Sequence, residues 1–400
     1  MIKNQNILCV SFPSWEGDYN KAIVRLISVL ARENRILFVD YGFTWKDMLA
    51  TLLQKQKAPV LRMLNFQNRL RNIEIEAQTF INILTPPPLL PINWLQPGMV
   101  YNQCLQWNAA IVKKSIQNSL DFLGMSKPIV INAFNPFLGL PMAEAFDEKL
   151  LLYYCYDEIG ASKWAGKHGE KIERKLIKKV DAVITTSNAL QQARQPINQN
   201  CYLVKNGVDF SLFNQAFSSK NSSTKLNKTV GYIGSVDERL DYELLHFLAE
   251  KAPNLQFHFI GRIMETKQQM KLRAMPNVIF LGPQPLNRLP DFLREMDLGV
   301  IPFKKSDFNR GIYPLKINEY LAAGKPVVMT DFAELPEFEN DVSIAQTAPK
   351  FLAAIHTELE TDCLDKQNER MKIAQSNSWE NRIEILSRVI EQKLEEKAAL

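Results

Sequence analysis

Short apolar runs alternate with amphipathic stretches over the first half of the chain. The runs at 6–12 (NILCVSF) and 35–41 (RILFVDY) are rich in β-branched and aromatic residues, and the segment 21–34 between them repeats its apolar positions at helical spacing. Apolar runs without polar alternation are typical of strands that a parallel sheet buries on both faces. The pattern predicts βαβ units, and further apolar runs predict strands at 80–84, 128–134, 151–158 and 181–187.

The same rhythm returns after a polar stretch at 214–229, NQAFSSKNSSTKLNKT, which is the best linker in the sequence. Strands are expected beyond it at 229–235, 256–261, 277–283 and 298–303. We therefore predict an α/β protein with two Rossmann-like parallel-sheet domains facing a cleft, which holds the ligands beyond the carboxyl ends of the strands. The expected boundaries are 1–213 for the first domain, 214–229 for the linker, 230–376 for the second domain and 377–400 for a terminal helix.

Length and composition agree with a soluble globular protein of two domains. The chain has 400 residues, of which 46% are hydrophobic and 23% charged. A net charge of +5 permits a phosphorylated ligand or an anionic membrane surface, and it does not indicate nucleic acid. The five cysteines are scattered, which predicts reduced thiols in a cytoplasmic protein. The apolar run at 6–12 is too short for a signal peptide and no apolar run reaches about 18 residues, so we expect neither a signal peptide nor a spanning helix.

Several catalytic motifs are missing from the sequence. It contains no GxSxG, GxxxxGK[ST], GxGxxG or HExxH, which argues against a hydrolase elbow, a P-loop, a simple NAD site and a zinc site. It also lacks Asp-x-Asp, the carboxylate pair that holds a divalent cation against a diphosphate in many sugar-nucleotide enzymes. We therefore expect no metal and no cofactor. A nucleotide sugar would have to be held by amides and cationic side chains.

The most informative stretch is RGIYPLKINEYLAAGKPVV at 310–328. Pro314 suits the first position of a helix, and Gly324 suits the left-handed residue that ends one. Lys316 and Glu319 are three residues apart and lie near the start of this helix, where the helix dipole favours an anion. Lys316 therefore needs an anionic ligand, and Glu319 can accept hydrogen bonds from a ribose diol. The alternative for the two residues is an ordinary surface salt bridge.

This stretch resembles the donor-binding helix of the group 1 glycosyltransferases, a large retaining family with the GT-B fold that includes teichuronic-acid-type cell-surface polysaccharide enzymes. VKNGVDFSLF (204–213), GYIGSVDERLDYELL (231–245) and SWENR (378–382) are similar to further family segments, and VSFPSWEGD (10–18) matches the family opening in part. The resemblance implies the transfer of a sugar from a nucleoside diphosphate sugar to a glycan or lipid-linked acceptor. This transfer is expected to need no metal and to retain the anomeric configuration. It makes Lys316 a catalytic residue and Glu319 a ribose-binding one.

Two departures from the family pattern affect the assignment of the site. Gly311 stands where many members have a first glutamate, so the resemblance leaves Asn309, Arg310 or Tyr313 to contact the sugar or the phosphates. The arginine that usually follows the glycine of the first donor-domain strand is also missing, because Ser235 follows Gly234.

The cations nearest to this glycine are the candidates for holding the diphosphate. Arg239 follows five residues after Gly234, and Arg262 follows Gly261 after the next strand. The alternative for Arg239 is a surface ion pair with Asp237 or Asp241.

Two loops of the first domain are expected near the reaction centre. Gly17 and Asp18 lie in the turn after the first strand, where family enzymes approach the transferring sugar; the alternative is an ordinary βα turn. Asp157 and Glu158 end an apolar strand, so either carboxylate can orient or deprotonate an acceptor hydroxyl. A retaining mechanism needs no strong base, and Asp157 would then position the acceptor. The alternative is a helix cap.

Two basic segments of the first domain, 48–72 and 163–179, mix cations with apolar residues. Such segments lie on anionic bilayers, which predicts a peripheral location at the inner face of the plasma membrane. The alternative for 163–179 is a solvated face over a buried stripe. Two other functions stay open for the whole chain: a non-catalytic protein that binds glycans or nucleotide sugars, and a sugar-nucleotide epimerase on the same fold.

Overall fold

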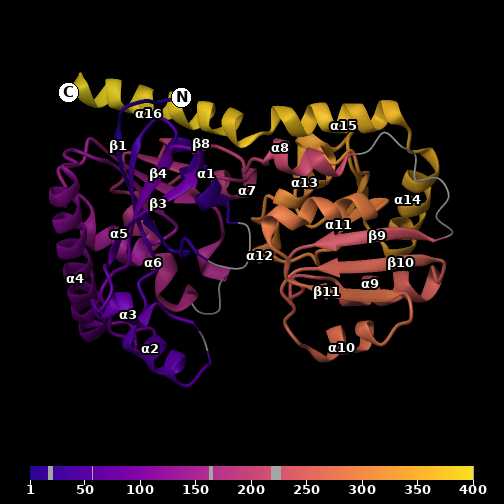
Figure 1. Ribbon diagram of the computed structural model, residues 1–400, viewed down its shortest axis with the longest axis horizontal. Helices are drawn as coiled ribbons and strands as arrows, with labels where there is room; N and C mark the ends of the chain where they lie inside the picture. The colour runs from indigo at the N-terminus through magenta and orange to yellow at the C-terminus, as the bar shows by residue number, and fades with distance from the viewer. Residues whose placement is uncertain (17–20, 56, 162–164, 218–226, 400) are drawn as a thin grey trace. The chain divides into compact units, whose positions relative to one another are not determined.

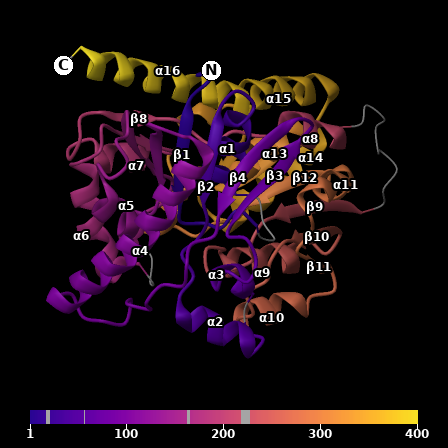
Figure 2. The same ribbon diagram turned by 60° about the vertical axis from the view of Figure 1, so that its left-hand side comes forward.

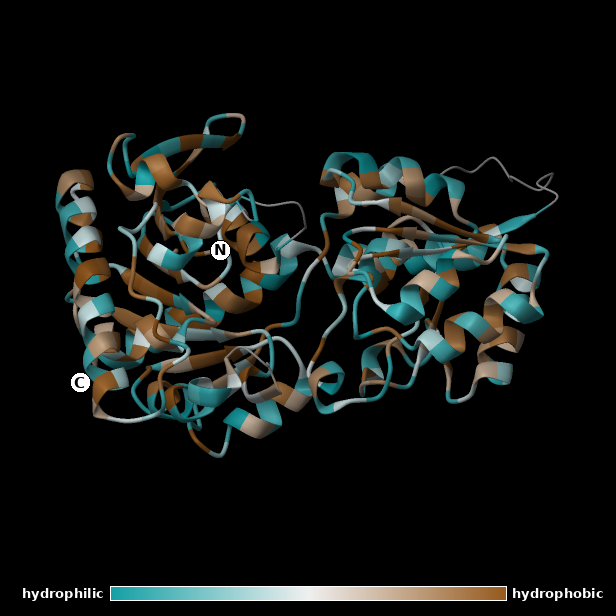
Figure 3. Cartoon of the chain, turned by 90° about the horizontal axis from the view of Figure 1, so that it is seen from below, coloured by the Kyte–Doolittle hydropathy of each residue, from teal (hydrophilic) through white to brown (hydrophobic). Residues whose placement is uncertain are grey.

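The computed structural model describes residues 1–16, 21–55, 57–161, 165–217 and 227–399. These residues form two units, the first drawn from 1–205 and 383–399 and the second from 206–382. The central part of the expected linker, 218–226, lies outside the described residues. Hydrophobic residues follow the strands of each unit (Figure 3).

The first unit is built on an eight-stranded sheet in the order β3-β4-β2-β1-β5-β6-β7-β8. Its neighbouring strands pair in parallel except for β3 and β4. The strands are β1 (Asn6–Ser11), β2 (Arg35–Val39), β3 (Leu70–Glu76), β4 (Thr79–Leu84), β5 (Ile129–Ala133), β6 (Leu150–Cys155), β7 (Ala182–Thr185) and β8 (Cys201–Leu203). The prediction of βαβ units is confirmed for this sheet apart from one edge.

That edge is the antiparallel strand β3, whose first three residues fall in the segment 48–72 that was expected to be one amphipathic stretch. The sequence LRNIEIE alternates between half-buried and exposed residues, as an edge strand with one solvated face does. Gln78, at φ +63°, closes the short hairpin to β4. The rest of the segment forms two short helices, α2 (Trp45–Leu52) and α3 (Val60–Met63).

The remaining helices of the first unit cover its sheet. They are α1 (Ala22–Leu30), α4 (Met99–Leu123), α5 (Pro136–Met142), α6 (Gly166–Ile177) and α7 (Asn188–Arg194). Helices α4, α5 and α6 pack against one another in series (Figure 2). Their apolar sides and the strands enclose one core, which includes Leu8, Val112, Ile116 and Leu176. In the described parts of the chain, no helix combines the length and apolarity that crossing a bilayer requires.

The second unit is built on a six-stranded, fully parallel sheet in the order β11-β10-β9-β12-β13-β14. The strands are β9 (Lys228–Ile233), β10 (Leu255–Ile260), β11 (Val278–Gly282), β12 (Leu298–Ile301), β13 (Val327–Thr330) and β14 (Ser343–Ala345). Strands β9, β10 and β11 lie side by side in Figure 1. Both sheets are thus of the parallel α/β type that the sequence predicts.

The helices of the second unit fall into two packed groups. Helices α8 (Phe210–Phe213), α11 (Leu289–Glu295), α13 (Leu315–Ala322) and α15 (Leu364–Ser376) contact one another, and so do α9 (Tyr242–Lys251), α10 (Lys267–Arg273) and α14 (Ala348–Thr361). A four-residue helix, α12 (Asp307–Arg310), precedes α13. The last helix, α16 (Trp379–Ala398), begins in the second unit and ends in the first.

The centre of the second sheet depends on a close approach of two side chains to glycine. The ring of Tyr320 lies over Gly299 in β12, and a Cβ added there would meet ring carbon Cδ2 at 2.5 Å. Behind that ring, the Tyr320 hydroxyl accepts a hydrogen bond from the Ile233 N–H at 2.8 Å. Gly231 in β9 makes room for Met296 in the same way, with its added Cβ 2.1 Å from the Met296 sulfur.

We expect Gly299→Ala to destabilise the second unit by about 1–3 kcal/mol, because the new methyl group must displace the buried Tyr320 ring from its hydrogen bond. Chemical denaturation measures the change. Gly98→Ala is the matched control, since a Cβ at Gly98 meets nothing within 4 Å. An unchanged denaturation midpoint for Gly299→Ala would show that the ring moves without cost.

Candidate active site

The candidate site begins where β9 and β12 separate. The two strands pair only at Leu298 with Val230 and at Gly299 with Gly231. The chain leaves β9 toward β10 and leaves β12 toward β13, so the connections run in opposite directions from this point. In open α/β sheets such a switch point leaves a crevice beyond the carboxyl ends of the strands. The Tyr320 hydroxyl occupies the start of the gap and bonds to Ile233.

Glycines end both β9 and β10 at this edge. Gly234 has φ +151° and Gly261 has φ +145°, backbone angles that residues with a side chain rarely adopt. A Cβ on Gly261 would lie 2.1 Å from the Gly234 carbonyl oxygen, and one on Gly234 would lie 2.2 Å from Lys316 Cε. The glycines therefore let the two loops and the Lys316 side chain come together at one place.

Lys316 is the second residue of α13, and its half-buried side chain crosses the end of β9. The ammonium lies 5.5 Å from the ring centre of Tyr232 and 5.8 Å from that of Phe303. The pKa of Lys316 is lowered to about 8, mainly by desolvation and next by the charge of Arg239, whereas Glu319 and Asp237 act in the opposite direction. An anion bound beside this ammonium would stabilise its charged form.

Arg239 reaches the same aromatic ring from the loop after β9. Its guanidinium lies 5.7 Å from the centre of Phe303, so that ring carries both cations. Arg239 also forms a two-point ion pair with Asp237, with Nε–Oδ1 and Nη2–Oδ2 distances of 2.8 and 2.7 Å. The ion pair named above as the alternative for Arg239 is thus formed, and it fixes the guanidinium beside the Lys316 ammonium.

Arg262 belongs to the neighbouring loop after β10. Its carbonyl accepts from the Val236 N–H at 2.8 Å, and the Met264 N–H donates to the Val236 carbonyl at 2.9 Å. These bonds hold the two loops against each other. The Arg262 side chain is exposed, and its role as a phosphate ligand stays a prediction.

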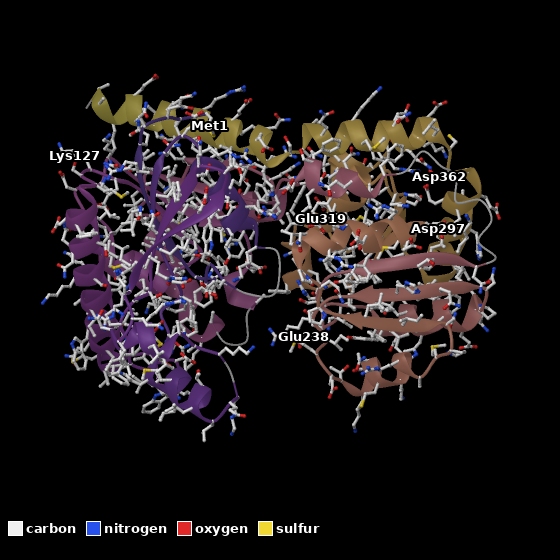
Figure 4. The ribbon with its side chains drawn as sticks, in the orientation of Figure 1. Met1, Lys127, Glu238, Asp297, Glu319 and Asp362 are labelled. Atoms are coloured by element: carbon white, nitrogen blue, oxygen red, sulfur yellow. The ribbon has the colours of Figure 1, made fainter. Side chains whose placement is uncertain are left out.

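Glu319 lies one turn after Lys316 on α13 and is 5% exposed. Figure 4 shows Glu319 and the exposed Glu238 at the edge of the second unit where β9 ends. Pro314 stands immediately before the helix, with ψ 117°, rather than at the first helical position as predicted. Gly324, which follows the C-terminal end of α13, has the left-handed conformation that the sequence predicts, at φ +71°.

The three residues proposed in place of the missing glutamate differ in environment. Asn309 is fully buried, and its amide donates to the carbonyls of Arg239 and Lys304 at 3.1 and 2.8 Å. Tyr313 is also buried, with its hydroxyl accepting from Asn318 at 3.1 Å. Only the Arg310 side chain is exposed, and it lies 3.5 Å from Asp307. Of the three, Arg310 has the side chain that a ligand can reach.

In the first unit, the residues after β6 form a charged cluster. Asp157 is half-buried and accepts a hydrogen bond from the Glu158 N–H at 3.1 Å, in front of a 3₁₀ turn at Ile159–Ala161. Both readings of Asp157, as a residue that positions the acceptor and as a helix cap, stay predictions. Glu158 receives two hydrogen bonds from the guanidinium of Arg194, at 2.5 and 2.8 Å.

Arg194 connects this loop to a buried carboxylate that the sequence does not mark. Its Nη2 also donates to Glu173 at 3.0 Å, and the Tyr153 hydroxyl donates to the other Glu173 oxygen at 2.7 Å. Burial raises the pKa of Glu173, while Arg194 opposes that shift. Sequence reasoning missed this network because its partners are 20 to 36 residues apart, and no local spacing joins them.

The turn after β1 is described only in part. Gly17 and Asp18, both predicted to bind substrate, lie outside the described residues. The residues before them are fixed: the Trp15 N–H donates to Asp40 at 2.7 Å, and Arg71 forms a 2.6 Å ion pair with Glu16. The role of this turn remains a prediction.

The described parts of the chain contain no group of three or more His, Cys, Asp or Glu side chains arranged to hold a metal ion. The polar groups gathered at the end of β9 are instead an ammonium, a guanidinium and the start of a helix. Such donors suit an anionic ligand.

Comparison with known proteins gives a family for the second unit. Residues 227–361 match the family model described as Glycosyl transferases group 1. Over 214 residues the chain is 27% identical to a Bacillus subtilis (strain 168) protein provisionally assigned as teichuronic acid biosynthesis glycosyltransferase TuaH, covering 49% of this chain and 54% of that protein. The chain thus spans about half the length of the curated relative it matches.

Solved structures share the fold over nearly the whole chain. Sucrose-phosphate synthase from Thermosynechococcus elongatus is 15% identical with a TM-score of 0.68, over 97% of this chain and 99% of that one. Anabaena HepE, solved in complex with UDP and glucose, is 14% identical with a TM-score of 0.63, over 97% and 100%. The predicted fold and the family resemblance are therefore confirmed: residues 227–361 match the group 1 glycosyltransferases, and the chain shares the GT-B fold of the solved structures.

Proposed function

We propose that this chain transfers a sugar from a nucleoside diphosphate sugar to a glycan or lipid-linked acceptor, in the synthesis of a cell-surface polysaccharide. The transfer uses no divalent cation and retains the anomeric configuration. The observation that carries the proposal is the pairing of Lys316 and Arg239 on one aromatic ring at the end of β9. Support comes from the family match of the second unit and from the provisional assignment of the Bacillus relative.

In this proposal the two cations replace a metal ion. As the bond between the anomeric carbon and the diphosphate breaks, negative charge develops on the leaving group. Lys316, the first-turn amides of α13 and Arg239 would stabilise that charge, and the proximity of both cations to the ring of Phe303 supports this role. Preorganised donors of this kind often supply the largest single contribution to catalysis. Arg262 and Arg310 are exposed cations that add phosphate or sugar contacts.

The other proposed roles follow from position. Glu319 accepts hydrogen bonds from the ribose hydroxyls, one helical turn away from the phosphate-binding lysine. Asp157 positions the acceptor hydroxyl, whose oxygen bonds to the anomeric carbon while its proton passes to the departing diphosphate. Gly17 and Asp18 approach the transferred sugar. The UDP and glucose bound to HepE, which has the same fold, support a nucleotide-sugar donor.

We place this reaction in the cytoplasm, at the inner face of the plasma membrane. The cysteines support a reducing compartment, since all five are free thiols. A lipid-linked acceptor would bring the enzyme to the membrane surface.

A non-catalytic nucleotide-sugar-binding protein is the second candidate, and Gly311 in place of a glutamate is the observation that favours it. An epimerase on the same fold is a third. Turnover distinguishes all three: a transferase releases nucleoside diphosphate and forms a glycoside, an epimerase changes the sugar, and a binding protein does neither.

The central test is a thermal-shift screen of nucleotide sugars, followed by turnover assays of the one that raises the melting temperature. We expect nucleoside diphosphate release, transfer to acceptor and undiminished rates in excess EDTA. Loss of activity that only added metal restores would contradict the metal-independent mechanism, and tight binding without turnover would favour the binding protein.

Lys316→Ala should lower kcat by about 10²–10³-fold, with a smaller effect on the KM for the donor, because it removes charge stabilisation of the leaving group. Lys316→Arg should restore part of the rate, since a planar fork does not replace a compact ammonium. Lys350→Ala, at an exposed lysine of the same unit, is the control. Wild-type turnover in Lys316→Ala would place leaving-group stabilisation elsewhere.

The pH dependence of binding provides a separate readout of Lys316. With its pKa near 8, the ammonium is charged below that pH and neutral above it. The affinity for the nucleoside diphosphate should therefore fall as the pH rises through about 8, with proton uptake on binding in that range. Calorimetry in buffers of different ionisation enthalpy measures both. The Lys316→Arg variant stays charged and should show neither effect.

Glu319→Ala should weaken nucleoside diphosphate binding by about 1.5–3 kcal/mol, the value of a hydrogen bond to a charged group. The loss should be specific to the ribose. A 2′-deoxy nucleoside diphosphate should bind wild type more weakly than the ribose form does, and this difference should shrink in Glu319→Ala. Glu360→Ala, at an exposed glutamate, is the control. Unchanged affinity in calorimetry would assign Glu319 a structural role.

A further inference from the structure

Helix α2 turns an apolar stripe outward. Trp45, Leu49, Leu52 and Leu53 recur at the i, i+4, i+7 and i+8 positions of one helical face, Leu53 directly following the helix. In a globular protein this face is normally buried, yet the four residues are 47%, 62%, 70% and 67% exposed. Met48, three residues after Trp45 and four before Leu52, borders this stripe; it is 7% exposed and is the buried residue of the helix.

The next helix and the turn after it also expose large apolar residues. Leu61 in α3 is 53% exposed, and Phe66 in the turn behind it is 77% exposed. The Phe66 N–H donates to the Leu61 carbonyl at 2.8 Å, and the Ala58 N–H donates to the Thr51 hydroxyl at 3.0 Å, which ties α3 to α2. The two helices lie side by side at one end of the first unit (Figures 1 and 2). We call these six apolar residues and their backbone the α2–α3 surface.

The exposed charge around this surface is positive and comes from lysines, since Arg62 lies 3.7 Å from Glu16 and Arg69 donates to backbone carbonyls. Segment 45–69 has five cations (Lys46, Lys55, Lys57, Arg62 and Arg69) and one acid. That acid, Asp47, is used in the capping box of α2, where it bonds to Thr44. The three lysines are exposed. An apolar face with a cationic rim matches a surface that is apolar inside and anionic outside.

Helix α6 shows why the other basic segment is different. Its cations Lys167, Lys171 and Arg174 are exposed, but its apolar residues Leu176 and Ile177 are fully buried in the core of the unit. It therefore has the solvated face that sequence analysis gave as its alternative. Charge alone does not distinguish α6 from α2; the direction of the apolar stripe does.

We propose that the α2–α3 surface inserts into the head-group region of an anionic lipid bilayer. Amphipathic helices with aromatic and leucine residues on one side and lysines on the other bind in this way. A second copy of this chain is disfavoured as the occupant, because two positive rims would repel each other. The inference deepens the membrane location proposed above, and it does not depend on the donor site.

Vesicle flotation tests the proposal, with phosphatidylcholine alone and with added phosphatidylglycerol. The full chain should bind the anionic vesicles, and binding should weaken with salt. Leu49→Gln/Leu52→Gln should reduce binding by about tenfold or more, since two apolar side chains no longer leave water. Lys55→Gln/Lys57→Gln should reduce it by about fivefold per lysine on anionic vesicles only.

The matched control is Met270→Gln/Leu364→Gln, which removes two side chains of the second unit that are 55% and 51% exposed. It should bind vesicles like wild type. Thermal unfolding checks that each variant is folded, and donor hydrolysis in solution checks that the site of the second unit is intact. Because flotation is measured without donor, a failure here leaves the proposed transferase function untouched, and the reverse also holds.

Depth of insertion gives an independent measurement. Brominated lipids should quench the fluorescence of Trp45, so Trp45→Phe should lose part of the quenching while keeping the binding. Equal binding of the Leu49→Gln/Leu52→Gln variant to anionic vesicles would overturn the proposal. So would a concentration-dependent dimer, seen by sedimentation, that this variant abolishes, because the occupant would then be a second copy of the chain.

Discussion

The separation of β9 from β12 is the constraint on which the candidate site depends. Two parallel strands that pair at only two positions leave backbone groups without hydrogen-bond partners in the sheet. A buried N–H without a partner is destabilising. The Tyr320 hydroxyl supplies that partner for Ile233, and it reaches Ile233 only because Gly299 has no side chain. The same opening admits Lys316 past Gly234. One helix, α13, thus closes the gap with its tyrosine and places a cation at its mouth.

The surroundings of Arg194 in the first unit and of Lys316 in the second differ in how they compensate charge. In the first, Arg194 donates to Glu158 and Glu173, and Tyr153 supplies a further donor, so each charge in the network meets a partner of opposite sign or a hydrogen bond. In the second, the Lys316 ammonium lies over two aromatic rings beside another cation, and its pKa is low. Compensated charges fix a loop, whereas a desolvated ammonium that has no direct ion pair among the described contacts gains from an incoming anion. This contrast is why we place the leaving group beside Lys316 and the acceptor beside Asp157.

Sequence periodicity predicted the parallel strands well, because strands buried on both faces are continuous apolar runs that few other elements resemble. It failed at β3, whose alternating LRNIEIE is half-solvated and antiparallel. For the site, local motifs predicted Lys316, Glu319 and Gly234, since these residues act through a helix start and a glycine turn. The Arg194 network and the role of Tyr320 depend on contacts between residues far apart in the chain, and no spacing in the sequence encodes them.

Helices α2 and α6 show the same limit from another side. A helical pattern fixes which residues share a face, but it does not say whether that face meets the core or the solvent. In α6 Leu176 and Ile177 are buried and the lysines form an ordinary outer surface, while in α2 Met48 is buried and four large apolar residues remain exposed. The apolar area left exposed on α2 is unfavourable in water, because it forgoes the free energy gained when apolar surface is buried. A partner that removes it from water is therefore the physical reason for such a helix to keep that composition, and the surrounding lysines make an anionic bilayer the partner that fits.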